Sequence, residues 1–248
     1  MTEEIKLNSS KLGTKEYWDN FYKKEQQNFK NNNDDTGECW FDDSDAESKI
    51  IQFLINELIP YFIENSTISF LDLGTGNGHL LFQLSEDLQE VIELEGAFHE
   101  NEFVFHGIDY SSDSVLFAQD IASKKYSNNN FKFDQVDLLS SNSEFLNNNK
   151  FDIILDKGTL DAIALNQDII TEDGKRGMDI YATQVKKMMK FDSILLITSC
   201  NFTEKELIKV ITSQTNLEVY DKINYPSFQF GGVKGSTVVS IAFCRAES

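Results

Sequence analysis

The sequence predicts an α/β fold, a parallel sheet whose strands are joined by crossover helices. Five short apolar segments have the length of strands, and helical patterns lie between most of them. This alternation is typical of strand–helix–strand units. Continuous apolar runs such as 151–155 favour strands buried on both faces. Gly74, Gly76 and Gly78 directly follow the first segment and indicate a turn that cradles a nucleotide-like ligand.

Hydrophobic periodicity places the elements in order. Trp18, Phe21 and Tyr22 recur at i, i+3 and i+4, which predicts an amphipathic helix within 14–30. A loop is expected over 31–45 and a helix over 46–64. The expected strands are 68–73, 103–108, 131–136, 151–155 and 193–199. The expected helices between them are 78–88, 111–125, 177–190 and 203–214.

Two stretches depart from this alternation. The acidic stretch 89–102 is expected to be a surface insertion before the second strand. After residue 215, the strand-like segments 217–225 and 237–244 are joined by a glycine-rich loop. We expect an N-terminal extension over 1–45, with a flexible start, an aromatic helix and an acidic loop, and one large domain over 46–248.

The composition limits the location and the partners. No apolar run reaches the roughly 18 residues of a membrane span, and the acidic N-terminus lacks an apolar signal core, so we expect a cytoplasmic protein. The three cysteines are far apart and form no disulfide framework and no zinc spacing, and no metal is expected. A net charge of −19 disfavours direct binding of nucleic acid and favours a basic partner, although it can also serve solubility alone.

The glycine spacing separates two kinds of cofactor. A dinucleotide fold uses G-x-G-x-x-G after the strand, whereas residues 74–78 read G-x-G-x-G with Asp72 two positions ahead. Ligands of open α/β sheets bind outside the carboxyl ends of the strands. Three further strand ends carry acids, Asp109, Asp137 and Asp156. A carboxylate at Asp109 can accept hydrogen bonds from both hydroxyls of a ribose.

Several motifs carry a resemblance to a known family. They are Tyr17-Trp18, Trp40-Phe41, and the segments 71–78, 156–162 and 228–232. Together they resemble the methyltransferase-like protein 10 family, which includes the fungal elongation factor methyltransferase 4 group. The resemblance implies a class I S-adenosylmethionine (SAM) methyltransferase with a seven-stranded Rossmann-like sheet, a C-terminal antiparallel hairpin and an N-terminal helical extension. It also implies a protein substrate, a lysine of translation elongation factor 1-alpha, and SAM as cofactor.

The strand ends and the resemblance together give the candidate site. Asp137 would meet the adenine amino group, and a neighbouring apolar side chain would cover the ring. The expected cofactor-binding residues are Trp40, Asp72, Gly74, Thr75, Gly76, Gly78, Asp109, Tyr110, Asp137, Leu138 and Asp156. The expected substrate-binding residues are Lys157, Gly158, Thr159, Phe228 and Phe230. Asp72 either contacts the ligand or holds the glycine loop by hydrogen bonds.

The expected chemistry is the transfer of a methyl group from a sulfonium to a lysine amine. Desolvation in an aromatic pocket favours the neutral amine, and Asp156 and Asp161 are the expected catalytic residues, which position the ammonium or remove its proton through water. Trp40, Phe228 and Phe230 are candidate pocket walls, with ordinary packing as the alternative reading. No histidine occupies an obvious base position, and a monomer is expected.

Other functions remain open at this stage. The same fold could serve a methyltransferase of another protein or of a small molecule, or a binding partner that holds SAM without catalysis. A nicotinamide dehydrogenase is disfavoured by the glycine spacing. An amine methyltransferase of nucleobases or glutamine is disfavoured because the Pro-Pro-aromatic pattern is missing after Asp156.

Overall fold

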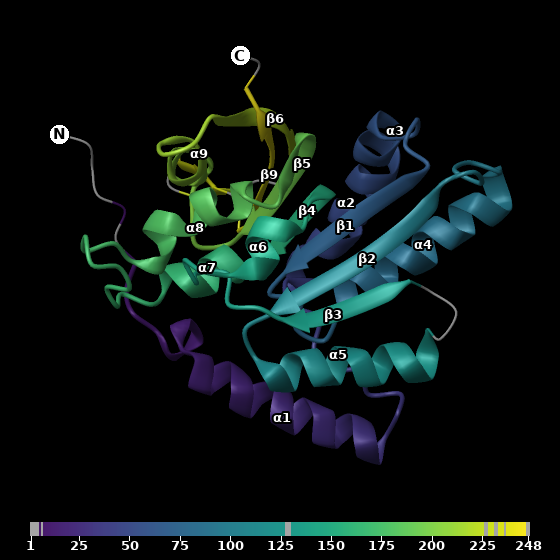
Figure 1. Ribbon diagram of the computed structural model, residues 1–248, viewed down its shortest axis with the longest axis horizontal. Coiled ribbons are helices and arrows are strands. Elements are labelled where there is room, and N and C mark those ends of the chain that lie inside the picture. Colours follow the sequence, from purple (N-terminus) through teal and green to yellow (C-terminus); the bar gives the residue numbers. More distant parts are fainter. Residues whose placement is uncertain are drawn as a thin grey trace.

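A computed structural model describes residues 5, 7–126, 130–225, 237–246 and the backbone of 228–230 and 233–235. Its centre is a seven-stranded sheet with the order β3-β2-β1-β4-β5-β9-β6 (Figure 1). The five strands on the β3 side of the sheet are parallel to one another, and β9 is antiparallel to both of its neighbours. The strands are β1 (Thr67–Leu73), β2 (Glu102–Asp109), β3 (Phe131–Gln135), β4 (Phe151–Lys157), β5 (Met189–Ser199), β6 (Leu217–Ile223) and β9 (Val239–Arg245).

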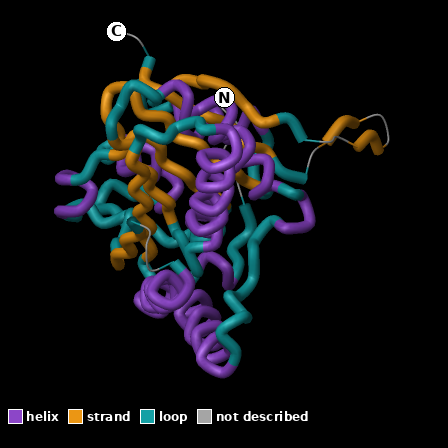
Figure 2. The backbone as a smooth tube through the Cα atoms, turned by 90° about the vertical axis from the view of Figure 1, so that its right-hand side faces the viewer, coloured by secondary structure: helices purple, strands orange, loops and turns teal. Residues whose placement is uncertain are grey.

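Helices lie on both faces of the sheet, as the view in Figure 2 shows. The N-terminal half of the chain contributes α1 (Lys15–Asn31), α2 (Ala46–Phe53), α3 (Ile59–Tyr61), α4 (His79–Glu95) and α5 (Ser112–Lys125). The C-terminal half contributes α6 (Glu144–Asn148), α7 (Thr159–Ala164), α8 (Gly177–Lys186) and α9 (Glu204–Thr212). None of the helices in the described ranges is both long and apolar enough to span a membrane.

The alternation of side chains along the strands divides the core into two halves. Ile153 and Leu155 of β4 pack with the cluster that α1, α2, α4 and α5 share, whereas Ile154 packs with the cluster of α6 to α9. All three are almost completely buried. Because successive side chains of a strand point to opposite faces, a continuous apolar run is what a sheet covered on both sides requires. The predicted parallel α/β sheet is therefore confirmed.

The stretch 89–102 is a correction to the expected surface insertion. Helix α4 does not end near residue 88 but continues to Glu95. Val91 and Ile92 extend the helical spacing of the buried Leu84 and Leu88. The helix ends where Gly96 adopts a left-handed conformation (φ 67°) and its N–H bonds to the Ile92 carbonyl, a common glycine C-cap. Its many acids make the exposed face of the helix acidic.

The expected helix over 46–64 is divided. A π-helical turn at Leu54–Leu58 separates α2 from the short α3, which has Pro60 in its first turn. The proline removes one helical hydrogen-bond donor, and this fits the change of hydrogen-bond pattern just before it. The short helices α6 and α7 were not predicted, because five or six residues give too little periodicity to recognise.

The C-terminal strands pair as expected. Strands β6 and β9 are antiparallel, with Leu217 opposite Arg245 and Ile223 opposite Ser240. The chain between them also forms a small separate sheet of β7 (Phe228–Phe230) and β8 (Val233–Gly235), which Figure 2 shows standing away from the main sheet.

Candidate active site

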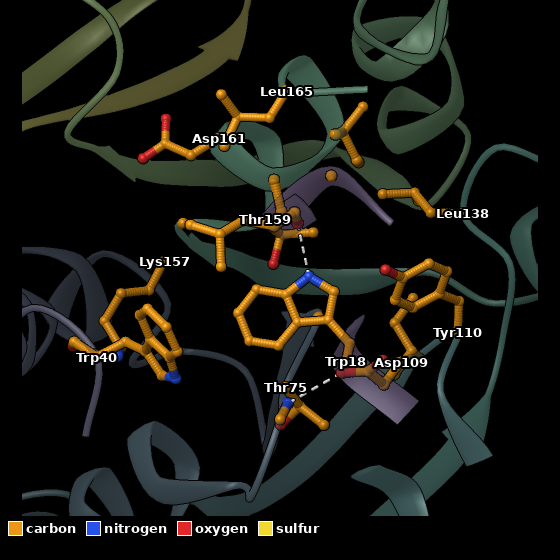
Figure 3. A pocket seen from close by; sticks show the side chains of 18 of the residues that line it. Trp18, Trp40, Thr75, Asp109, Tyr110, Leu138, Lys157, Thr159, Asp161 and Leu165 are labelled. Carbon is orange, nitrogen blue, oxygen red and sulfur yellow. Dashed lines mark hydrogen bonds between the residues drawn. The ribbon is translucent and has the colours of Figure 1, made fainter. Parts of the chain in front are cut away.

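A pocket of about 300 Å³ lies at the carboxyl ends of the parallel strands. Its floor comes from the ends of β1, β2 and β4, and its other walls come from the N-terminal segment and from the start of α7 (Figure 3). This is the edge of the sheet where open α/β folds hold their ligands. The position matches the prediction made from the strand-end residues.

The glycine turn after β1 approaches its neighbours too closely for any side chain. A Cβ at Gly74 would lie 2.1 Å from Thr159 Oγ1, and a Cβ at Gly76 would lie 2.4 Å from the Tyr22 hydroxyl oxygen. Both glycines also have positive φ angles, 62° and 58°, which other residues adopt at a cost. The hydroxyl of Thr159 donates a hydrogen bond to the Leu73 carbonyl, so α7 is fixed against this turn.

Asp109 is held in place by backbone donors. Its Oδ2 accepts from the Gly76 N–H at 3.1 Å and its Oδ1 accepts from the Ser111 N–H at 2.9 Å. The residue is only 5 % exposed, and burial raises the pKa of its carboxyl group. Each carboxylate oxygen has a second lone pair, so the group can still accept hydrogen bonds from a ligand in the pocket that it lines.

The end of β3 forms the next part of the wall. Leu138 is buried and lines the pocket, and Asp137 is exposed beside it with one oxygen accepting from the Leu139 N–H. Tyr110 also lines the pocket and lies near Leu138 (Figure 3). The second oxygen of Asp137 accepts no hydrogen bond from the described residues. This end of the pocket therefore offers an apolar surface, an aromatic ring and an acceptor, which suits a purine with an amino group.

Asp72 lies under the glycine turn and lines the pocket. It is 4 % exposed, and burial raises the pKa of its carboxyl to about 7. Next to it, the buried hydroxyl of Thr75 interacts with the Asp72 carboxyl and opposes the effect of burial on its pKa. The two side chains form a polar pair in the wall of the pocket.

Asp156 does not belong to the pocket wall, which corrects its expected contacts with cofactor and acceptor. Its carboxylate is 1 % exposed and is absent from the lining of the pocket. Its oxygens accept from the Thr159 and Leu160 N–H groups at the start of α7 and from the Tyr181 hydroxyl at 2.5 Å. Burial raises the pKa of Asp156 to about 7. The residue therefore supports the first turn of α7 from behind.

Asp161 lies on the pocket side of α7 and lines the cavity. Its oxygens accept from the Ser199 hydroxyl at 2.5 Å and from the Cys200 N–H at 2.8 Å, at the carboxyl end of β5. Burial raises the pKa of its carboxyl. Of the two acids expected to be catalytic, this is the one that the structure places at the cavity.

The three residues that follow Asp156 also lie at the pocket. Gly158 has φ 87°, and a Cβ there would lie 2.7 Å from the Phe41 ring, so the chain before η2 (Asp42–Ser44) packs directly on it. Thr159 braces the glycine turn, as described above. The Lys157 ammonium donates to the Trp40 carbonyl at 2.8 Å and lies 3.4 Å from Glu47 Oε2.

Trp18 and Trp40 bring the N-terminal segment into the pocket. Their ring centres are 5.2 Å apart, and both side chains line the cavity (Figure 3). The indole N–H of Trp18 donates to the Leu12 carbonyl at 2.7 Å, whereas the buried Nε1 of Trp40 has no partner among the described residues. Trp40 was predicted as a cofactor-binding residue. The side chains of Phe228 and Phe230, the other predicted aromatic walls, lie outside the described residues.

Sequence reasoning gave no site role to Trp18, Tyr22 and His79, which line the pocket, or to Glu47, which lies behind His79. The spacing of Trp18 and Tyr22 predicted the buried face of the first helix. It did not indicate that this face covers the pocket. His79 is the first residue of α4 and lies within the helix expected over 78–88. Glu47 gave no signal, because an acid in the first turn of a helix is common.

One group among the described residues has the ligand types of a metal site. Atoms of Cys39, Glu47 and His79 lie within 4.8 Å of one another. The Glu47 carboxylate already contacts His79 Nδ1 at 2.5 Å and the Lys157 ammonium. We therefore describe the group as a hydrogen-bonded cluster, and the expectation that no metal is bound stays a prediction.

The sequence was compared with known families and proteins. Residues 64–232 match the family described as "Methyltransferase domain". Over 96 % of both chains, 47 % of residues are identical to "Protein-lysine N-methyltransferase EFM4" of Saccharomyces cerevisiae. This chain belongs to the elongation factor methyltransferase 4 family. The predicted family is therefore confirmed.

Two further relatives extend the family beyond budding yeast. The protein of the same name from Schizosaccharomyces pombe is 39 % identical over 96 % of this chain and 95 % of its own. The human "EEF1A lysine methyltransferase 2" is 32 % identical over 94 % of this chain and 86 % of its own. The similarity therefore covers the N-terminal segment as well as the sheet.

Solved structures share the fold at low sequence identity. A TehB-like SAM-dependent methyltransferase from Corynebacterium glutamicum has a TM-score of 0.53 and 14 % identity, over 92 % of this chain and 98 % of that one. A magnesium protoporphyrin IX methyltransferase from Synechocystis with bound S-adenosylhomocysteine has a TM-score of 0.50 and 13 % identity, over 85 % and 90 %. The class I methyltransferase fold is thus confirmed.

SAM is the cofactor of this methyltransferase, and the pocket fits it. The strand ends supply in order an apolar and acceptor surface at Leu138 and Asp137, a held carboxylate at Asp109, and a turn without side chains at Gly74 and Gly76. The buried Nε1 of Trp40, which has no partner among the described residues, belongs to a side chain that lines the same cavity. These groups match a purine, a ribose and a close-lying polar chain.

Proposed function

We propose that this methyltransferase is a protein-lysine N-methyltransferase that acts on translation elongation factor 1-alpha. The observation that carries the proposal is similarity over nearly the whole chain to relatives named for lysine methylation, at 47 % identity in one fungal case. The vertebrate relatives carry EEF1A in their names. Because the similarity includes the pocket and its N-terminal cover, it supports a shared acceptor as well as a shared cofactor.

The bound cofactor supplies a methyl group on a sulfonium, and the residues of this chain supply alignment and environment. A free lysine amine has a pKa near 10.4 and is mostly protonated at neutral pH. When the lysine side chain enters the pocket beside Trp40 and Phe41, its amine loses contact with water. This lowers the pKa of the amine, because burial disfavours the charged form. The neutral amine can then act as the nucleophile.

Asp161 is the acid that we assign to the acceptor. It lines the cavity near the carboxyl ends of β4 and β5, and two donors on the β5 side hold its carboxylate. A carboxylate there can bind the incoming ammonium and pass its proton to water. Asp156 keeps α7, and so Asp161, in place.

The surface charge supports a basic protein substrate. The chain has 41 acidic and 22 basic residues, and long-range attraction of this kind raises the rate at which a basic partner arrives. We further propose that the enzyme works in the cytoplasm, where translation elongation takes place. Its monomeric state and the division of the chain near residue 45 stay predictions, which light scattering and limited proteolysis can test.

The direct test is methylation of purified elongation factor 1-alpha with SAM, read by mass spectrometry of its peptides. We expect one or a few lysines to gain methyl groups, and Asp109→Ala to remove the activity through loss of cofactor affinity. No transfer by a protein that still binds S-adenosylhomocysteine would refute the proposal. Methyl consumption in a protein-free extract would instead identify a small-molecule methyltransferase.

A further inference from the structure

Three charged side chains gather at one end of the pocket, away from the purine and ribose positions. Glu47 of α2 is almost completely buried, and its Oε1 lies 2.5 Å from His79 Nδ1. Its Oε2 lies 3.4 Å from the Lys157 ammonium. His79 and Lys157 line the cavity, and Glu47 stands behind them. This cluster has no part in holding the glycine turn or Asp109.

The cluster carries more positive than negative charge. Hydrogen bonds to Cys39 and Glu47 raise the pKa of His79 to about 10, so the imidazole is a cation at neutral pH. The pKa of Glu47 is lowered overall. Burial by itself would raise this pKa, but the contacts of the carboxylate with His79 and Lys157 have the larger combined effect. Two cations thus share one carboxylate. In a protein with a net charge of −19, two cations that contact one carboxylate in the wall of the pocket are a local exception.

A third donor lies at the same end of the pocket. The backbone carbonyl of Trp40 accepts from Lys157, which fixes the residue beside the cluster. Its indole Nε1 is buried, has no partner among the described residues and belongs to a side chain that lines the cavity. A buried N–H without an acceptor costs free energy, so a ligand acceptor at this place would remove a penalty.

The order of the strands in the sheet indicates which part of the cofactor would reach the end of the pocket at His79 and Lys157. Asp137 and Leu138 follow β3 and Asp109 ends β2, whereas Lys157 ends β4 and His79 follows the turn after β1. The strand order β3-β2-β1-β4 therefore sets the cluster beyond the glycine turn from the nucleoside positions. SAM is a nucleoside joined to an α-amino acid group, so a cofactor with its nucleoside at Asp109 and Leu138 would direct that group beyond the turn.

We propose that His79, Lys157 and the Trp40 indole N–H form the binding site for the α-carboxylate of the cofactor. Glu47 is a positioning residue that holds both cations toward the cavity. Asp72, which also lines this part of the pocket, supplies an acceptor for the α-ammonium group. Charge-assisted hydrogen bonds from two cations suit a carboxylate. The proposal concerns cofactor binding alone and does not depend on the protein substrate.

Calorimetry with two ligands tests the proposal without any methyl transfer. S-adenosylhomocysteine carries the amino acid group, and 5′-methylthioadenosine has the same nucleoside and thioether without it. We expect Lys157→Met to weaken S-adenosylhomocysteine about tenfold or more, the loss typical of a hydrogen bond to a charged group. The affinity for 5′-methylthioadenosine should change by less than about threefold, since the lost contact is to the missing group.

Trp40→Phe is the second variant, because it keeps an aromatic ring and removes the indole N–H together with part of the ring system. It should also weaken S-adenosylhomocysteine selectively, by about fivefold. If Lys157→Met does not fold, the affinities of Trp40→Phe for the two ligands test the proposal. Lys15→Met is the matched control, since Lys15 lies over the Tyr110 ring at the opposite end and should affect both ligands alike. Equal weakening of both ligands by Lys157→Met and Trp40→Phe, or no weakening, would overturn the proposal.

Discussion

Lys157 and Trp40 are 117 positions apart in the sequence, yet the ammonium of one donates a 2.8 Å hydrogen bond to the backbone carbonyl of the other. This bond joins the end of β4 to the segment that precedes the sheet. It brings Trp40 to the cavity, where it lies against Trp18 of α1. The N-terminal segment is thus a wall of the site, and the predictions below test what each wall does.

Gly74→Ala should both destabilise the protein and abolish tight cofactor binding. The new methyl group would collide with Thr159, and the left-handed backbone adds strain, so we expect a loss of about 3 kcal/mol in the free energy of unfolding. Gly96→Ala is the matched control, because Gly96 has a similar φ of 67° but open space around it. It should cost about 1 kcal/mol and leave binding of S-adenosylhomocysteine unchanged. Similar losses in the two variants, measured by urea unfolding, would show that the contact with Thr159 is unimportant.

Cofactor binding should change the tryptophan fluorescence of the whole protein. The chain has only two tryptophans, Trp18 and Trp40, and both line the pocket. A ligand beside them replaces water and alters their emission. Titration with S-adenosylhomocysteine should therefore give a saturable change, and Trp18→Phe and Trp40→Phe should each remove part of it. An unchanged spectrum at saturation, with binding confirmed by calorimetry, would place the ligand elsewhere.

The cofactor-free protein should lose stability as the pH rises from about 4 to about 7, and Asp72 should account for part of the loss. Burial raises the pKa of Asp72 to about 7 in the folded protein, above its ordinary value of 3.8. Between these values the folded state holds a proton that the unfolded state has released. The contribution is complete below the unfolded pKa and disappears as the pH passes about 7.

One such group changes the free energy of unfolding by about 1 kcal/mol per pH unit within that interval. Denaturant unfolding at several pH values should show a smaller slope for Asp72→Asn than for the unmodified protein. The exposed Asp192 provides the control, and Asp192→Asn should keep the original slope. If Asp72→Asn keeps it as well, Asp72 does not titrate in this interval.

Asp161→Asn and Asp156→Asn should have different effects, because only Asp161 borders the cavity. We expect Asp161→Asn to lower the rate of methyl transfer by about 100-fold while the affinity for S-adenosylhomocysteine stays within about threefold. Asp156→Asn should instead lower the free energy of unfolding by about 2 kcal/mol, since it weakens a buried network with Tyr181 and the start of α7. Single-turnover kinetics and thermal unfolding separate the two effects. Asp161→Asn with full activity would remove Asp161 from the mechanism.

Much of the fold could be predicted because the sheet has a simple pattern. Each buried strand is a short apolar run, and each run ends in a residue that must lie at the same edge of the sheet. Asp109 could therefore be placed from its position alone. The extent of α4 was missed because its last turns are acidic and only Val91 and Ile92 mark the buried side.

Asp156 shows the limit of that reasoning. It ends β4 in the same way as Asp109 ends β2, yet its carboxylate turns behind the pocket and binds the first turn of α7. Side chains alternate along a strand, and the residue at its end can also be drawn to the free N–H groups of the next helix. The pattern of acids could not separate these two outcomes.

The sequence by itself determined the parallel α/β sheet, the glycine turn and the strand ends that border the pocket, because local periodicity marks the strands and parallel strands end at the same edge of the sheet. Only the tertiary structure decided which acid faces the cavity, how Trp18 and Trp40 close it, and that Glu47 joins His79 to Lys157. Those contacts join residues 22 to 117 positions apart. They depend on how the N-terminal segment packs across the end of the sheet. That packing cannot be predicted from a local pattern of residues.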